Sequence, residues 1–254
     1  MSAPRDLFRR PPDKGRVAVV SGGSRGLGRV LVERLLADGW RVATFSRKAN
    51  GFTEATAEKH QDSFHWAPVD LTDSAALRSF GRDVVLRFGR LDLLVNNARV
   101  LHQELFLTAA PGRIEALVGA NLLGPLHLTQ VCARVMVRSG GGSVVNISTV
   151  EASLGCRGVA VHAAAKAGLE GLGRSLAREL GPLGIRVNSL SPALFDSDMT
   201  GDDTSHDREK IQHRSPLRRL RTVDEVADAV LLLASPQAGF ITGQTWVIDG
   251  GVTR

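Results

Sequence analysis

His162 and Lys166, four residues apart, are the side chains in this chain with the most evident capacity for chemistry. They stand in a segment with helical spacing, and residues i and i+4 share one face of a helix, so both can reach one ligand. An imidazole, with an ordinary pKa of about 6.5, can act as a general acid or base at neutral pH. A neighbouring ammonium group disfavours its protonated form. The chain of 254 residues contains no tyrosine, so no phenol can do the same work.

A glycine-rich turn is the second candidate site. Gly22, Gly26 and Gly28 lie between an apolar run over 17–20 and a helical pattern over 27–37. Glycines in this position allow a tight turn and let the backbone approach a pyrophosphate at the helix N-terminus. Such turns also occur for packing alone, but the strand–helix context predicts a nucleotide site. The other members of the predicted cofactor loop are Ser24, Arg25 and Leu27.

The end of the second expected strand indicates which nucleotide is bound. Arg47 stands there, where an acidic residue would favour NAD by bonding the ribose 2′-hydroxyl. Arg25 and Arg47 could instead clamp a 2′-phosphate from two sides. Both could also be ordinary surface arginines in an arginine-rich chain. The pattern favours NADP(H) over NAD.

Strand-like apolar runs alternate with helical patterns along the whole chain. The expected strands are 17–20, 41–45, 64–69, 91–95, 143–147, 185–190 and 245–248, and the expected helices are 27–37, 74–88, 114–137, 161–180 and 224–234. This alternation predicts an α/β fold, a single Rossmann-type doubly wound parallel sheet of about seven strands with helices on both faces. Ligand sites then lie at the carboxyl ends of the strands. We expect residues 1–14 to form a disordered N-terminal extension and residues 15–254 to form one dinucleotide-binding catalytic domain.

Composition and charge narrow the function classes. No apolar run approaches the roughly 18–20 residues that span a bilayer, and the N-terminal residues lack the apolar core of a secretory signal. Cys132 and Cys156 are far apart and are expected to be reduced thiols in a cytoplasmic protein. The net charge of +6 comes from dispersed arginines and does not indicate nucleic acid. Seven basic or histidine residues form a cluster that is either a solvated surface or a site that attracts an acidic partner such as an acyl carrier protein. It consists of Arg208, Lys210, His213, Arg214, Arg218, Arg219 and Arg221.

Together these motifs resemble the short-chain dehydrogenase/reductase family, most closely its β-ketoacyl carrier-protein reductases. The resemblance covers nearly the whole chain after residue 14. Beyond the glycine loop it is carried by Asp70-Leu71, Asn96-Asn97-Ala98, Asn121, Arg186-Val187-Asn188, Ser191-Pro192 and Ile248-Asp249-Gly250-Gly251. The family's catalytic signature is Tyr-x-x-x-Lys, in which the tyrosine is here His162. Three further departures are Arg99 and Ala193 in place of glycine, and Thr149 in place of serine.

The resemblance implies a role for each matched residue. Asp70 and Leu71 contact the adenine, and Asn97 lies beside the cofactor. Asn121 positions Lys166 through water, and Lys166 holds the nicotinamide ribose. Thr149 bonds the substrate carbonyl, and His162 or a bridging water donates the proton. Arg99, Thr149 and Phe195 are expected around the substrate, and the variable loops 99–105 and 194–216 build its pocket. Arg99 either pairs with an anionic group of the ligand or turns to solvent.

Three hypotheses about function follow. The first is an atypical NADPH-dependent ketoreductase acting on a small or carrier-bound, polyketide-like substrate. The second is an isomerase, lyase or cyclase that reuses the pocket, and the third is a non-catalytic partner subunit of a related reductase. By resemblance the chain forms a homodimer or homotetramer, or a hetero-oligomer with a paralogue. No metal is expected, because the histidines lack ligand spacing and the acidic stretch around Asp196 lacks a calcium-loop pattern.

Overall fold

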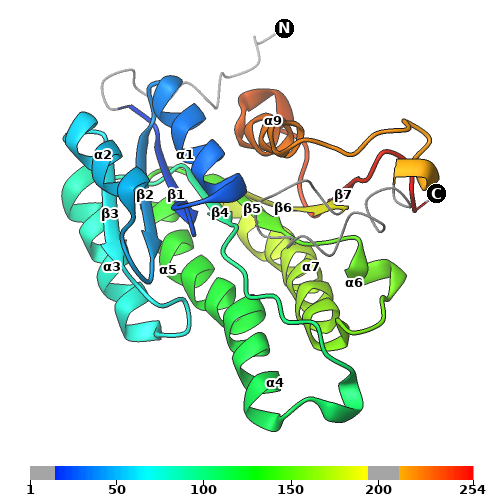
Figure 1. Ribbon diagram of the computed structural model, residues 1–254. Coiled ribbons are helices and arrows are strands. Elements are labelled where there is room, and N and C mark those ends of the chain that lie inside the picture. Colours follow the sequence, from blue (N-terminus) through cyan, green and yellow to red (C-terminus); the bar gives the residue numbers. More distant parts are fainter. Residues whose placement is uncertain (1–14, 194–211, 254) are drawn as a thin grey trace, which may run out of the picture.

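Seven parallel strands form one sheet at the centre of the molecule (Figure 1). The computed structural model describes residues 15–193 and 212–253. The strand order is β3-β2-β1-β4-β5-β6-β7, and every neighbouring pair is parallel. The strands are β1 Val17–Ser21, β2 Arg41–Ser46, β3 Phe64–Pro68, β4 Leu93–Asn96, β5 Gly142–Ile147, β6 Ile185–Pro192 and β7 Thr245–Ile248. The predicted Rossmann-type doubly wound sheet is confirmed.

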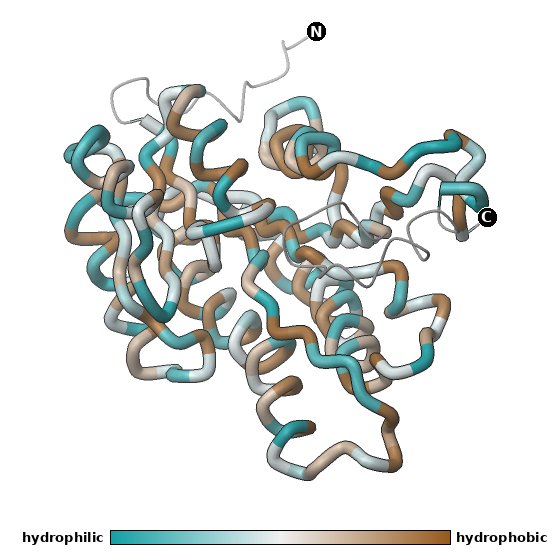
Figure 2. Tube along the Cα trace, viewed as in Figure 1, coloured by the Kyte–Doolittle hydropathy of each residue, from teal (hydrophilic) through white to brown (hydrophobic). Residues whose placement is uncertain are grey.

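Helices cover both faces of the sheet (Figure 1). They are α1 Gly26–Ala37, α2 Gly51–Lys59, α3 Ser74–Phe88, α4 Pro111–Val118, α5 Gly124–Arg138, α6 Glu151–Leu154, α7 Ala160–Leu180 and α9 Val223–Ala234. Side chains of a strand alternate between faces, so Val17 and Val19 pack with α3 and α5 while Ala18 and Val20 pack with α1 and α9. Figure 2 shows the helices banded in both hydropathy colours, as amphipathic helices with one buried side should be.

The long helix predicted over 114–137 is divided in the structure. α4 and α5 are joined by a π-helical turn, Gly119–Leu123, and Pro125 stands in the first turn of α5. A π-helical turn marks a local insertion and is frequent at functional sites. Helices α2 and α6 were not predicted, although Asn50 and Thr53 form a capping box at the start of α2. Both additions leave the predicted topology unchanged.

The stretch Pro111–Arg138 needs separate comment because of its hydropathy. Among the described residues it is the one helical stretch long and apolar enough to cross a membrane by length and composition. The sequence analysis did not anticipate this. Half of its most apolar window is buried, and α5 packs against α3 and the sheet. Its apolar character is therefore accounted for by the hydrophobic core.

The order of the strands places the topological switch point of the sheet at β1. The chain runs from β1 outward to β2 and β3, then returns to β4 on the other side of β1. Ligands of open α/β sheets bind at such a switch point, outside the carboxyl ends of the strands. The predicted extension 1–14 and most of the predicted substrate loop 194–216 lie outside the described residues.

Candidate functional site

The glycine-rich turn has the backbone that a bound pyrophosphate requires. Gly22 and Gly26 have φ of 70° and 53°, in the left-handed region that favours glycine. A Cβ on Gly28 would lie 2.2 Å from the carbonyl oxygen of Gly22, so only glycine allows this close approach of helix and turn. Arg25 is the N-cap of α1 and its side chain does not cap the helix, so the first N–H groups of α1 can serve an anion. These residues fit a dinucleotide.

The other predicted members of the cofactor loop differ in what they offer. Ser24 is half-buried, and its carbonyl oxygen accepts a hydrogen bond of 2.9 Å from the Asn50 side chain, which fixes the turn against α2. Leu27 is 4% exposed, so its side chain belongs to the core and leaves the backbone for a ligand. Arg25 is exposed. The loop thus combines a backbone fixed by a hydrogen bond with the exposed cation Arg25.

The expected adenine and ribose end lies after β2 and β3. Arg47 is exposed, and its positive charge contributes to lowering the pKa of Asp70. The larger causes of that lowered pKa are hydrogen bonds from the backbone and hydroxyl of Thr72, at 2.8 and 2.7 Å. Leu71 is buried. Asp70 therefore caps its own turn, and Arg47 is an exposed cation close enough to act on its charge.

The asparagines after β4 tie strands together. The Asn97 side chain donates 2.9 Å and 3.3 Å hydrogen bonds to the carbonyl oxygens of Ser21 and Gly22. Asn96 donates to Thr129 and Asn146, both at 2.8 Å, inside the core. Asn97 therefore holds the backbone of the glycine-rich turn in place through its bonds to Ser21 and Gly22.

Asn121 holds the backbone that borders the pocket. It is fully buried in the π-helical turn, where its side-chain oxygen accepts from the N–H of Val100 at 3.1 Å. Its amide donates to the carbonyl oxygens of Val100 and Leu117, at 2.8 and 2.9 Å. This exchange fixes the segment after Arg99. Among the described residues, Asn121 bonds Val100 and Leu117, and no direct hydrogen bond joins it to Lys166. The water expected between Asn121 and Lys166 stays a prediction.

Lys166 lies one turn after His162 on α7, at the carboxyl end of β5. Its ammonium group donates a 2.7 Å hydrogen bond to the carbonyl oxygen of Ile147, and the side chain is 1% exposed. Burial, helped by the positive charge of Arg99, lowers the pKa of Lys166 to about 7. The lysine therefore sits at the boundary between its charged and neutral forms at neutral pH.

His162 is buried and is neutral at pH 7. It is 2% exposed, and its Nδ1 has no hydrogen-bond partner among the residues the structure describes. Burial lowers its pKa to about 4, with help from the charges of Lys166 and Arg99 and against a backbone hydrogen bond with Val100. The predicted effect of Lys166 has the right direction, but burial is the larger cause. An imidazolium is thus not the resting form of this group.

Thr149 and Glu151 form a pair at the end of β5. Thr149 is half-buried, and its hydroxyl accepts from the backbone N–H of Glu151 at 3.4 Å. A side-chain hydrogen bond also joins the two residues, and the charge of Arg99 acts on the Glu151 carboxylate. Burial nevertheless raises the pKa of Glu151 above its ordinary value. The sequence analysis missed Glu151, although an acid two residues after the predicted Thr149 was a usable signal.

Arg99 is the electrostatic centre of the pocket. Burial lowers its pKa, Glu151 opposes that change, and Arg25 adds to it. Its own charge lowers the pKa of His162, Lys166 and Arg221. Of the two predicted alternatives, solvent exposure is wrong, because Arg99 is half-buried within reach of these groups. Its positive charge faces the site.

Arg221 corrects one part of the sequence analysis. It was included in the basic cluster interpreted either as a solvated face or as an attraction for an acidic partner, but it is only 8% exposed and does not belong to a solvated face. Its Nε donates to the carbonyl oxygen of Ala193 at 3.0 Å, and its Nη2 donates to the same atom. Burial lowers its pKa to about 9. Arg221 thus holds the end of β6 beside the pocket, an arrangement that only the tertiary fold creates.

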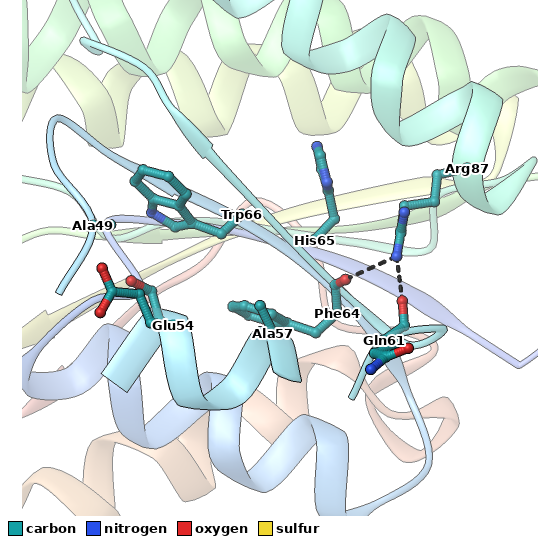
Figure 3. Close-up of a pocket in the computed structure, with 9 residues that line it drawn as sticks. Ala49, Glu54, Ala57, Gln61, Phe64, His65, Trp66 and Arg87 are labelled. Atoms are coloured by element: carbon teal, nitrogen blue, oxygen red, sulfur yellow. Dashed lines mark hydrogen bonds between the residues drawn. The ribbon is translucent and has the colours of Figure 1, made fainter. Parts of the chain in front are cut away.

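Other candidates lie elsewhere or outside the described residues. Phe195 falls in the part of the chain that is not described. No group of three or more metal-ligating side chains gathers within 15–193 and 212–253, and Cys132 and Cys156 are free thiols there. A surface hollow of about 380 Å³ at the edge strand β3, lined by Phe64, His65, Trp66 and Arg87 among others (Figure 3), contains none of the predicted site residues.

Comparison with known proteins adds to this geometry. The family described as "Enoyl-(Acyl carrier protein) reductase" matches residues 22–253. The 3-oxoacyl-(acyl-carrier-protein) reductase FabG of Escherichia coli (strain K12) is 34% identical over 239 residues, covering 94% of this chain and 98% of that protein. The enzyme of the same name from Staphylococcus aureus (strain Mu50) is also 34% identical, covering 92% and 97%. A gluconate 5-dehydrogenase from Burkholderia cenocepacia J2315, solved with NADP and tartrate, superposes with a TM-score of 0.88 at 28% identity, covering 94% and 96%.

Proposed function

The chain belongs to the short-chain dehydrogenase/reductase family, and we propose that it is an NADPH-dependent ketoreductase with an altered proton-donating site. The observation that carries the proposal is the hydrogen bond from Lys166 to the carbonyl oxygen of Ile147, which holds the lysine at the carboxyl end of β5, on the same edge of the sheet as the glycine loop, with His162 one turn away on α7. This is where a doubly wound sheet binds its ligands. The relatives named as reductases, and the structure with NADP bound, support the same conclusion.

The protein's own residues provide the cofactor site. The glycine turn and the N-terminus of α1 would hold the pyrophosphate, and Arg25 and Arg47 would hold the 2′-phosphate. When bound, NADPH supplies a hydride to the carbonyl carbon. One N–H group of Lys166 bonds the Ile147 carbonyl oxygen, and the other N–H groups would bond the ribose. Asn121 keeps the Val100 backbone in place.

The carbonyl oxygen needs a hydrogen-bond donor and a proton. The Thr149 hydroxyl is half-buried at the end of β5 and can donate to that oxygen. His162 fills the helix position of the family's tyrosine. Because its pKa is about 4, its contribution near neutral pH is that of a neutral ring, either directly through an N–H or through a bridging water. We propose that His162 shapes and polarises the site in this neutral form.

The substrate is proposed from chemistry and from the relatives together. A keto group on a small or carrier-bound, polyketide-like molecule suits the resemblance to 3-oxoacyl reductases. The positive charge of Arg99 and Arg221 suits an anionic substrate, as in the gluconate enzyme. We further propose that the protein works in the cytoplasm as a homodimer or homotetramer, or with a related subunit.

The experiment measures NADPH oxidation with two keto substrates, acetoacetyl-coenzyme A and 5-ketogluconate. The wild-type protein should bind NADPH more tightly than NADH and oxidise it with at least one substrate, and Lys166→Ala should weaken NADPH binding and abolish turnover. NADPH binding without turnover, with activity only after mixing with a related reductase, would establish the non-catalytic subunit instead. Conversion of a substrate without NADPH oxidation would establish the isomerase, lyase or cyclase alternative.

A further inference from the structure

The site lacks an obvious acid, because burial lowers the pKa of His162 to about 4. Reduction of a ketone requires a proton at the carbonyl oxygen as the hydride reaches the carbon. The chain has no tyrosine, and the His162 imidazolium is disfavoured by burial beside Lys166 and Arg99. Lys166 is bonded to Ile147, and its remaining N–H groups are assigned to the ribose. The acid must therefore be sought among groups that the family resemblance does not name.

Glu151 lies in the right place for this task. It begins α6, two residues after Thr149, and its backbone N–H and its carboxylate both bond the Thr149 hydroxyl. An oxygen atom bonded by that hydroxyl would therefore lie next to the carboxyl group. Glu151 is half-buried, so its proton can be restored from solvent. A general acid must stand within hydrogen-bond reach of the atom it protonates, and the contact with Thr149 brings Glu151 next to the hydroxyl that would hold that atom.

The groups that act on Glu151 come from three segments, and one of them, Arg99, carries a charge. Arg99, after β4, attracts the carboxylate and lowers its pKa. The exposed thiol of Cys156, after α6, is within electrostatic reach of Glu151. Thr149, at the end of β5, bonds the carboxylate by its hydroxyl. Burial exceeds the first and third of these effects, so the pKa of Glu151 is raised overall, as in other carboxyl groups that act as acids.

We propose that Glu151 is the proton donor for the carbonyl oxygen that Thr149 holds. This assignment rests on the proposed ketoreductase function. Bound NADPH would supply the hydride and electron pair for the new C–H bond at the carbonyl carbon and would leave as NADP⁺. The C=O π-electron pair forms an O–H bond with the proton of the Glu151 carboxyl group. Glu151 is left as a carboxylate facing Arg99, and it regains its proton from solvent.

The first test compares three variants of the full-length protein under the same assay with acetoacetyl-coenzyme A and 5-ketogluconate. Glu151→Gln keeps the size of the side chain but cannot supply the proton, so kcat should fall by about 100-fold or more while NADPH affinity is unchanged. Glu170→Gln is the matched control, because Glu170 accepts a 2.6 Å hydrogen bond from Ser148, the residue before Thr149. It should keep wild-type kcat. His162→Phe should lose less activity than Glu151→Gln.

The second test uses pH, where a purely structural Glu151 would give no signal. Activity should fall as pH rises through the pKa of Glu151, because only the protonated form donates. In Arg99→Leu the carboxylate loses its attracting charge, so the pKa rises further and the falling limb should move to higher pH. Independently of activity, carbon-13 NMR of the glutamate carboxyl groups should show one resonance titrating above the others, and Glu151→Gln should remove it.

The outcomes separate the two levels of the proposal. If wild-type protein oxidises NADPH with neither substrate, the ketoreductase function fails and the assignment of Glu151 fails with it. If wild-type protein is active and Glu151→Gln keeps its kcat and pH profile, the function stands and Glu151 is not the donor. Loss of activity in His162→Phe, with Glu151→Gln unaffected, would return the role to His162.

Discussion

The burial of His162 next to Lys166 and Arg99 predicts a specific weakness of the fold in acid. The pKa of His162 falls from 6.5 to about 4 on folding, so between these values the unfolded chain binds a proton that the folded chain excludes. Stability that is fully present above pH 6.5 is therefore lost as pH falls towards 4. The full loss is about 3 kcal/mol, of which about 2 kcal/mol should be gone at pH 5.

The perturbation that isolates this effect is His162→Phe, which keeps an enclosed ring and removes the titrating group. Urea unfolding of both proteins at about pH 7.5 and pH 5 gives the change in free energy of unfolding for each. The wild-type protein should lose about 2 kcal/mol more than the variant between these conditions. Lys166 titrates in both proteins, so its contribution largely cancels in the comparison.

Equal losses in the two proteins would refute this reasoning. They would mean that His162 takes up its proton as readily in the folded chain as in the unfolded chain. The electrostatic description of the pocket, with neutral His162 beside two cations, would then be wrong. An unchanged unfolding slope at the two pH values is the control that the same unfolding reaction is being compared.

Two further predictions concern the cofactor site. Gly28→Ala should abolish NADPH binding measured by fluorescence titration, because the new Cβ would lie 2.2 Å from the Gly22 carbonyl oxygen. The control Gly51→Ala, with open space around its Cβ and no positive φ, should bind NADPH normally. Normal binding by Gly28→Ala would contradict the close contact between helix and turn. Arg47→Glu should weaken NADPH binding by about tenfold or more and leave NADH binding equal or stronger, since a carboxylate repels the 2′-phosphate and bonds a 2′-hydroxyl. An unaltered preference in Arg47→Glu would remove Arg47 from the nucleotide site.

Boundary signals in the sequence made some elements predictable, although α2 was missed despite its capping box. α3 begins and ends where predicted, because Asp73 caps its first N–H groups and Gly89 closes it in the left-handed conformation. The break between α4 and α5 was not predicted, since a π-helical turn leaves the apolar pattern of a continuous helix intact. α6 was missed because a helix of four residues is too short to show a period.

The candidate site divides in the same way. The glycine loop could be predicted because its chemistry lies in the backbone of consecutive residues. The direction of the His162 pKa shift followed from Lys166 one turn away, but its main cause, burial, depends on packing. Glu151 and Arg221 are separated by 70 positions along the chain, and their relation to Arg99 arises only when β5, α9 and the segment after β4 meet at one edge of the sheet.

Arg99 gives the altered residues of this pocket a common physical explanation. Burial is the main reason that His162 and Lys166 are hard to protonate, and the charge of Arg99 adds to this effect at both residues. The same charge stabilises the carboxylate of Glu151, the species left behind when that residue gives up a proton. Without such a partner the half-buried carboxyl group would hold its proton more strongly. One cation in place of a glycine therefore disfavours one acid and makes another usable, so the loss of the tyrosine and the presence of Arg99 are best understood as parts of a single change in how the site handles its proton.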